Sequence, residues 1–140
     1  MKTMRFGWMV AVLALAASGC GGDDDADENT TALEIIGEYE DNFGGEQIIT
    51  ADAWNGSTIQ DYDNDENVVY TQNSEEDFNP EKFSKFVYTD VEDDSFYFCQ
   101  VVFDAETLED AQESDATADD SDPASGGCGG DFEWTLATRK

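Results

Sequence analysis

The chain has 140 residues, of which 34 are acidic and only six are basic, so its formal net charge is −28 at pH 7. Such a surface excludes nucleic acid and anionic lipid as partners, because phosphate groups are bound by clustered Lys and Arg side chains. The chain contains no His, which excludes a Ser-His-Asp or Cys-His triad and a His-ligated zinc or iron site within it.

Residues 1–19 have the three parts of a secretory signal peptide. Lys2 and Arg5 form a positively charged start, residues 6–17 are mostly apolar, and small residues follow. The apolar stretch is shorter than the ~20 residues that a transmembrane helix needs. The sequence therefore predicts export of the chain and removal of residues 1–19.

The end of this leader, Leu15-Ala16-Ala17-Ser18-Gly19-Cys20, resembles the lipobox of bacterial lipoproteins. In those proteins the Cys becomes the mature N-terminus and carries a diacylglyceryl group, often with an amide-linked chain such as palmitate. The resemblance implies lipid attachment at Cys20 and stable membrane anchoring, because two or more acyl chains hold a protein firmly. Ala17 stands where the lipobox usually has Leu, so an ordinary signal peptide with an incidental Cys20 is the alternative.

Residues 20–31 are predicted to be an acidic, flexible tether, because they lack large apolar side chains and carry a run of Asp and Glu. An Asp immediately after the Cys would resemble an inner-membrane retention signal, and in this chain that position is Gly21. By analogy, the outer membrane is favoured over the inner membrane as the place of anchoring in the cell envelope, with the periplasm as the adjoining compartment.

Loss of the leader removes Lys2 and Arg5 and takes the net charge from −28 to −30. The surface would attract cations and basic partners, with cation binding that is weak and diffuse. The competing interpretation, which we favour, is an acidic surface suited to salty surroundings, where counter-ions screen the repulsion.

Residues 32–140 are predicted to form a single small β domain, since about one hundred residues suit one core. Short runs rich in aromatic and β-branched residues alternate with Asp, Asn and Gly, as is typical of an all-β chain. The expected strands are residues 33–39, 46–54, 58–62, 68–72, 83–91 and 95–103. The expected turns are residues 41–45, 63–67 and 92–94, and Asn55-Gly56 is a strong hairpin signal.

The apolar pattern changes after these strands. Residues 105–113 predict a short surface helix and residues 119–130 a loop, while residues 132–136 predict a last strand or an apolar plug against the core. Short connections favour antiparallel pairing of neighbouring strands. The expected fold is therefore all-β, a small antiparallel meander barrel or sandwich.

Once Cys20 is lipidated, Cys99 and Cys128 remain, and an oxidising compartment favours a disulfide between them. The bond would close a loop of about thirty residues, which contributes roughly 3–4 kcal/mol by the chain-entropy estimate. A redox-active pair is the alternative, but neither a Cys-x-x-Cys spacing nor a nearby basic residue is present to activate a thiolate.

Five stretches of the mature chain combine turn, aromatic and Cys residues. They are Asp41-Asn42-Phe43-Gly44-Gly45, Tyr62-Asp63-Asn64, Phe83-Ser84-Lys85-Phe86, Phe98-Cys99-Gln100 and residues 121–130. Together they resemble a module of small, uncharacterised proteobacterial lipoproteins, which implies a disulfide-stapled β domain and no particular activity. The triplet Gly37-Glu38-Tyr39 is also loosely similar to the start of lipocalin-like barrels.

Two classes of non-catalytic function fit this composition. The favoured class is a membrane-anchored structural or interaction domain without a pocket. The alternative is a β-barrel that binds a small apolar or sugar-like ligand. The residues able to line its interior or mouth, unless they only fill the core, are Tyr39, Trp54, Tyr70, Tyr88, Tyr97 and Trp134. A carboxylate pair could hydrolyse glycosides, but no pair can be singled out, so neither a catalytic residue nor a cofactor is predicted.

A weak metal candidate lies in the stretch that contains Asp61, Asp63 and Asp65, whose alternating oxygens resemble the first half of an EF-hand loop. Glu66 stands where Gly is needed, and Gln72 where a bidentate Glu is expected. The competing interpretation, which we favour, is a hairpin turn in which Asp and Asn bond their own backbone. The sequence therefore predicts no tight metal site.

Overall fold

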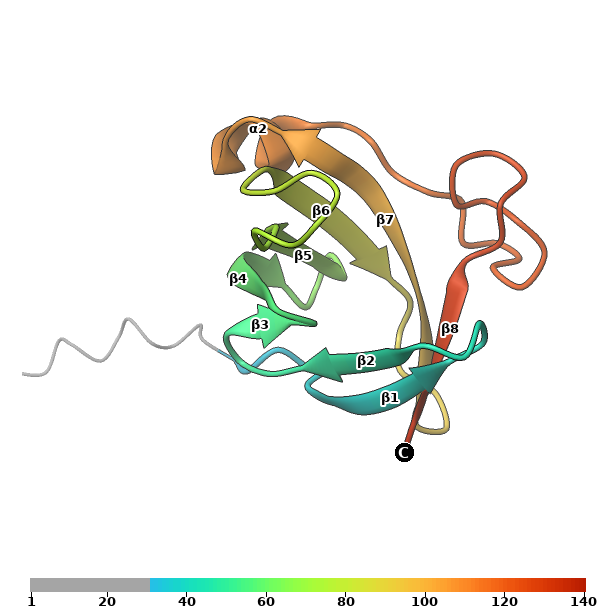
Figure 1. Cartoon of the computed structure of the whole chain (residues 1–140). Coiled ribbons are helices and arrows are strands. Elements are labelled where there is room, and N and C mark those ends of the chain that lie inside the picture. The colour runs from blue at the N-terminus through green and yellow to red at the C-terminus, as the bar shows by residue number, and fades with distance from the viewer. Residues whose placement is uncertain (1–30) are drawn as a thin grey trace, which may run out of the picture. The chain divides into compact units, whose positions relative to one another are not determined.

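The structure, a computed structural model, describes residues 31–140, of which Ala32–Lys140 form one compact unit. Eight strands close into a barrel (Figure 1). The elements are β1 (Gly37–Asp41), β2 (Glu46–Ile49), β3 (Ala53–Trp54), β4 (Ser57–Asp63), β5 (Val68–Gln72), β6 (Phe83–Tyr88), β7 (Ser95–Ala105), α2 (Leu108–Glu113) and β8 (Thr135–Arg139). The predicted signal peptide, Cys20 and the tether up to residue 30 lie outside the described residues.

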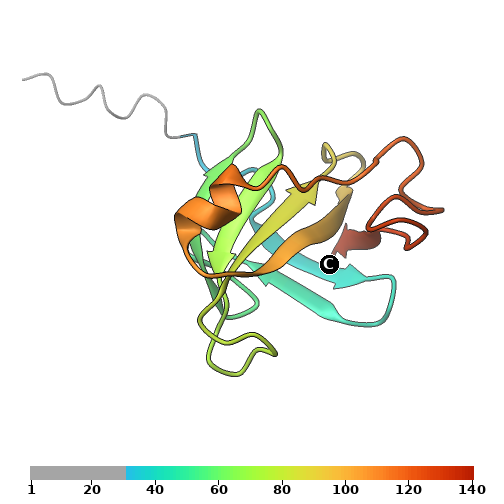
Figure 2. The same ribbon diagram turned by 90° about the horizontal axis from the view of Figure 1, so that it is seen from above.

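Every strand pairs antiparallel with the next strand in the chain, and β8 returns to pair with β1. The closing registers place Tyr39 opposite Arg139 on one side of β8 and Phe96 opposite Ala137 on the other. Seen from above, the strands surround one interior (Figure 2). The predicted all-β fold is confirmed, and of the two predicted architectures the structure is the barrel.

The predicted Asn55-Gly56 hairpin is confirmed. Asn55 and Gly56 have φ of 49° and 94°, the positive values that a two-residue turn between twisted antiparallel strands requires. The Asn55 side chain also holds β2, since its Oδ1 accepts the Ile48 N–H at 2.7 Å and its Nδ2 donates to the Glu46 carbonyl at 3.2 Å. A local sequence signal thus fixes both the turn and its neighbouring strand.

The prediction of one strand over residues 46–54 is wrong, because the chain folds back at Thr50. The Thr50 hydroxyl accepts the N–H of Asp52 at 3.2 Å and of Ala53 at 3.0 Å. The Thr50 N–H donates to the Ala53 carbonyl at 2.8 Å. A β-branched residue favours strands by packing, but its hydroxyl can also close a turn on its own backbone. The result is two short strands, β2 and β3, in place of one.

The first predicted strand, residues 33–39, also differs from the structure, where β1 begins at Gly37. Leu33 and Ile35 are apolar because they are buried in the core ahead of the strand, with 3% and 0% exposure. Asn64, in the β4–β5 turn, holds this segment by accepting the Glu34 N–H at 3.2 Å and donating to the Ala32 carbonyl at 2.9 Å.

Four later boundaries shift as well. The strand predicted over residues 83–91 ends at Tyr88, and β7 extends to Ala105. The short helix is present but begins at Leu108, since the hydroxyl of Thr107 caps it by accepting the Asp110 N–H at 3.0 Å. The last strand begins at Thr135, not at residue 132.

The barrel interior is filled by packed aromatic rings. Trp54 stacks on Phe86, with 4.6 Å between ring centroids, and meets Phe98 edge-on at 5.1 Å. Tyr39 meets Phe96 edge-on at 5.0 Å. Such offset and edge-on contacts add to the free energy gained by burying the rings. The buried core consists of Leu33, Ile35, Tyr39, Ile49, Trp54, Val69, Tyr88, Phe96, Phe98 and Ala137.

Part of the buried interior is polar. Thr71 and Ser84 face each other on β5 and β6, and both are fully buried. The Ser84 hydroxyl donates to Asn73 Oδ1 at 2.6 Å and accepts from Gln100 Nε2 at 2.9 Å. Among the described residues the Thr71 hydroxyl has no hydrogen-bond partner. This network ties the interior to the β5–β6 loop that begins at Asn73.

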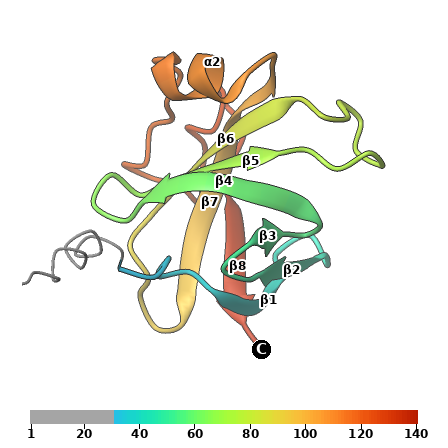
Figure 3. The same cartoon turned by 90° about the vertical axis from the view of Figure 1, so that its left-hand side faces the viewer.

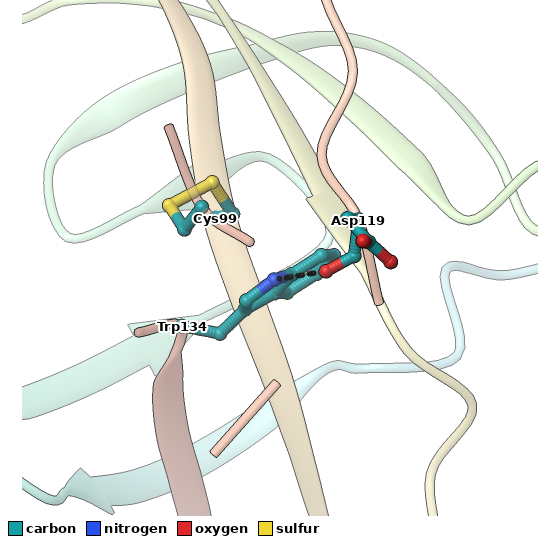
Figure 4. Close-up of a disulfide and its surroundings, with 4 residues drawn as sticks. Cys99, Asp119 and Trp134 are labelled. Carbon is teal, nitrogen blue, oxygen red and sulfur yellow. Dashed lines mark hydrogen bonds between the residues drawn. A yellow bond between two sulfur atoms is a disulfide. The ribbon is translucent and has the colours of Figure 1, made fainter. Parts of the chain in front are cut away.

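The disulfide lies on the outer side of the barrel. Phe96 and Phe98 of β7 point inward, so alternation turns Cys99 outward. Cys99 and Cys128 are bonded, with 5.6 Å between their Cα atoms, and the predicted disulfide is confirmed (Figure 4). It fastens the connection between α2 and β8, residues 114–134, to the outside of β7.

Trp134 lies near the disulfide, and we call the two together the outer cluster (Figure 4). Trp134 is 2% exposed, yet it precedes Thr135, which pairs with the inward Phe98, so its ring lies outside the barrel. Its Nε1 donates to the Asp119 carbonyl at 3.0 Å (Figure 4). Of the two expectations for residues 132–136, the last strand is present from Thr135 onward. The plug against the core is wrong, because Phe132 is 76% exposed and Trp134 lies on the outer side of the sheet.

The disulfide generates a stability prediction. Replacing both Cys99 and Cys128 by Ser should lower the free energy of unfolding by about 3–4 kcal/mol, because the unfolded chain regains the entropy of a loop of about thirty residues. Urea denaturation of the residue 32–140 domain measures the change. Wild-type protein unfolded with reductant is the control and should match the double variant. An unchanged midpoint in both would contradict the stapling role.

Candidate functional site

The six aromatic residues proposed to line a ligand site do not come together. Tyr39, Trp54 and Tyr88 lie in the packed core. Trp134 lies in the outer cluster. The remaining two, Tyr70 and Tyr97, are half-buried on the outer face. The interior therefore uses its aromatic residues for packing, and the candidate site lies on the outside of the barrel.

One outer face, across β4, β5 and β6, carries a groove of about 500 Å³. Figure 3 shows these three strands side by side with α2 above them. Cross-strand pairing brings Asp61 next to Tyr70 and Tyr70 next to Lys85. We call the following set the outer groove: Asp61, Tyr62, Asp63, Glu66, Val68, Tyr70, Lys85, Val87, Gln112 and Thr117.

A shift of register in β4 places Asp61 in this groove. Ile59 packs against the core, so strict alternation would also turn Asp61 inward. The pairing slips between Ile59 and Asp61, which leaves Gln60 as the extra residue of a bulge. Asp61 is thereby placed opposite Tyr70 on the outer face, while Tyr62 packs against the core. Bulges commonly redirect a side chain in this way.

The helix and the chain after it close one side of the outer groove. Gln112 of α2 donates its Nε2 to Asp61 Oδ2 at 2.8 Å. The Lys85 ammonium donates to the carbonyls of Ser114 and Ala116, both at 3.0 Å. Lys85 is therefore engaged in holding the connection, and the outer groove keeps an excess of carboxylates.

The pKa of Tyr70 reflects the negative charge of the outer groove. Its pKa is raised above the ordinary value, first by burial of the phenol and then by the negative charges of Asp61, Asp63 and Glu66. A neutral phenol beside three carboxylates offers a ring face and a hydroxyl in a field of negative potential. This arrangement favours a positively charged group and disfavours an anion.

Side-chain oxygens of Asp61 and Asp63, two of the three candidate metal ligands, accept hydrogen bonds from nearby backbone N–H groups. Asp63 Oδ1 accepts the N–H groups of Asp65 at 2.8 Å and Glu66 at 3.2 Å. Asp61 Oδ1 accepts the Tyr62 N–H at 3.0 Å. The turn that we favoured over an EF-hand is present. In residues 31–140, no group of three or more His, Cys, Asp or Glu side chains is arranged to hold a metal ion.

The basic residues of the domain do little to offset its acidic surface. Three of them form ion pairs, which are Lys82–Glu106, Arg139–Asp94 and Lys140–Glu46. The fourth, Lys85, is bound to backbone carbonyls. Exposed pairs of this kind contribute little to stability. The excess negative charge faces solvent, where it can act on a binding partner.

Comparison with protein-family models, with curated proteins and with solved structures finds no match to this chain. Within residues 31–140, no helix has the length and apolar character needed to cross a membrane.

Sequence reasoning missed most of the outer groove. Lys85 and Gln112 come from β6 and α2, and only the register and the helix position bring them beside Asp61. The one usable signal was Lys85 itself, one of only four basic residues in residues 32–140. No local pattern indicated Gln112.

The turn geometry predicts weak, diffuse calcium binding. Asp63→Asn removes one charge but keeps the oxygen that accepts the two turn N–H groups, so the domain should stay folded. Calorimetry should show shallow binding that this substitution changes only slightly. Asp52→Asn, which removes one charge elsewhere, is the matched control and should behave alike. A single-site micromolar isotherm abolished by Asp63→Asn alone would contradict the turn interpretation.

Proposed function

We propose that this chain is a lipid-anchored lipoprotein of the bacterial cell envelope, at the outer membrane, whose barrel is a non-catalytic interaction domain for cationic partners. The lipobox-like stretch ending at Cys20 and the acidic run after it support the anchoring. The aromatic packing of the interior favours the outer surface over an interior ligand site. The observation that carries the proposal is the outer groove, where the negative charges of three carboxylates act on the Tyr70 side chain.

The outer groove fits the end of a Lys or Arg side chain. Tyr70 offers a ring face for a cation–π contact. Asp61 and Asp63 can accept charge-assisted hydrogen bonds from an ammonium or guanidinium group. Val68 and Val87 offer apolar surface to the aliphatic stem of such a side chain. A volume of about 500 Å³ is ample for one side chain.

Electrostatics sets the character of this binding. Interactions between exposed charges are screened over about 8 Å at physiological ionic strength. Complementary charge therefore speeds encounter and selects the sign of the partner more than it raises affinity. We expect weak, salt-sensitive binding of basic segments and none of acidic ones.

Binding of oligolysine tests the outer groove. Tyr70→Ala should weaken binding of a fluorescent oligolysine to the domain by about threefold to tenfold, since one cation–π contact is lost. Fluorescence anisotropy at low and physiological salt measures this change. Tyr97→Ala, at another half-buried outward Tyr, should leave binding unchanged. Equal losses in both variants, or no binding at low salt, would contradict the groove.

Anchoring is tested at Cys20. The full chain expressed in a bacterium should fractionate with membranes, incorporate a palmitate analogue and show a lipid-modified N-terminal Cys20 by mass spectrometry. Cys20→Ala should abolish the lipid label and the membrane association, because no acyl chain can be attached. Cys99→Ser, which keeps Cys20, should retain both. An unmodified wild-type protein in the soluble fraction would refute the anchoring.

A further inference from the structure

The loop between β5 and β6, residues 73–82, presents an aromatic side chain to solvent. Phe78 is 94% exposed, more than any other large apolar side chain of the described residues. Figures 2 and 3 show that this loop projects from the barrel, at the end opposite the β4–β5 turn. An isolated exposed Phe is common on protein surfaces, so the conformation of the loop decides what Phe78 can do.

The base of the loop is closed by Asn73, which is 5% exposed. Its N–H donates to the Lys82 carbonyl at 2.8 Å, and its carbonyl accepts the Glu81 N–H at 3.1 Å. Its side-chain amide donates to the Asn79 carbonyl at 2.9 Å, and its Oδ1 accepts the Ser84 hydroxyl. The loop is thus fastened to the buried polar network of the barrel.

The tip of the loop is also held on both sides of Phe78. The Asp77 N–H donates to the Ser74 carbonyl at 3.1 Å, and Asp77 Oδ1 accepts the Asn79 N–H at 3.2 Å. The Asn79 carbonyl accepts the Lys82 N–H at 3.3 Å. A loop ordered before binding loses little conformational entropy when it binds, so burial of the exposed ring is translated into affinity.

Charge selects the partner of this loop. Acidic residues stand on both sides of Phe78, at Glu75, Glu76, Asp77 and Glu81. An apolar surface that covers the ring must approach through their negative potential. An anionic membrane would be repelled, whereas an apolar surface bordered by Lys or Arg would be attracted. A cationic amphipathic peptide segment combines these two properties.

We propose that loop 73–82 binds cationic amphipathic peptide segments, with Phe78 buried in the apolar face of the peptide and the flanking carboxylates facing its basic residues. This inference rests on the proposed function in cation binding and adds the place and the apolar half of the interaction. Truncation of a buried aromatic anchor removes a large share of the binding free energy. We expect a loss of about tenfold in affinity, which is about 1.4 kcal/mol.

The test uses two peptides with the same number of Lys residues, an amphipathic Lys/Leu helix and an oligolysine. Phe78→Ala should weaken binding of the Lys/Leu peptide about tenfold, and Phe78→Trp should restore it, since an aromatic ring is again available. Oligolysine binding should be unchanged in both variants. Phe43→Ala is the matched control and should leave binding of the Lys/Leu peptide unchanged, because Phe43 is 67% exposed on a different turn, between β1 and β2. Thermal unfolding confirms that each variant is folded.

The two peptides separate the two proposals. Equal affinity of wild type and Phe78→Ala for the Lys/Leu peptide would overturn the role of the loop. The proposed cation-binding function, which oligolysine tests, would be unaffected. Failure of wild type to bind oligolysine would instead overturn the cation-binding function. A third outcome is that wild type binds phosphatidylcholine vesicles, Phe78→Ala does not, and wild type has no affinity for the Lys/Leu peptide. That result would assign the loop to a lipid surface and overturn the peptide proposal.

Discussion

Closure of the barrel by the pairing of β8 with β1 is the constraint on which the other features depend. The register places Arg139 opposite Tyr39. The Arg139 guanidinium donates to the Tyr39 hydroxyl at 2.9 Å and lies 4.9 Å from the centre of its ring. Because Tyr39 in turn packs edge-on against Phe96, this contact joins the closing strands to the core. The disulfide lies at the neighbouring strand pair, β7–β8, since Cys99 follows Phe98, the β7 residue that pairs with the first residue of β8.

A closed barrel of eight strands has an interior just wide enough for side chains or one small ligand. Here aromatic rings occupy that interior, so recognition of a partner falls to the outer face and the loops. The outer groove and loop 73–82 are both built on β5 and β6, but they use different ends and faces of these strands. The groove depends on outward side chains such as Tyr70, whereas the loop is held through Asn73 by the inward Ser84. A rigid sheet can therefore position two surfaces independently.

The sequence predicted those features that local chemistry determines. Asn55-Gly56 determined a hairpin because its backbone angles follow from residue type. The pairing of Cys99 with Cys128 followed from the expectation that Cys20 carries a lipid, which left one possible disulfide. Thr50 was misjudged, because its preference for strands and its ability to close a turn compete, and only the packing decides between them. The outer groove was out of reach for a different reason. One extra residue in β4 reverses the direction of Asp61, and a bulge of this kind leaves no trace in the alternation of a strand with polar residues on both faces.

The exposed aromatic residues and the acidic surface are best understood together. The side chains of Phe43, Phe78, Phe103 and Phe132 are more than half exposed, which in a neutral protein would promote self-association. Residues 32–140 contain 29 acidic and 4 basic residues, a net charge of −25, so two copies of the domain repel each other before these rings can meet. The repulsion weakens only for a surface of opposite sign, where the same carboxylates become attractive. In the function that we propose, negative charge keeps the exposed rings available in water and restricts their use to basic partners, so that affinity and selectivity would come from different side chains.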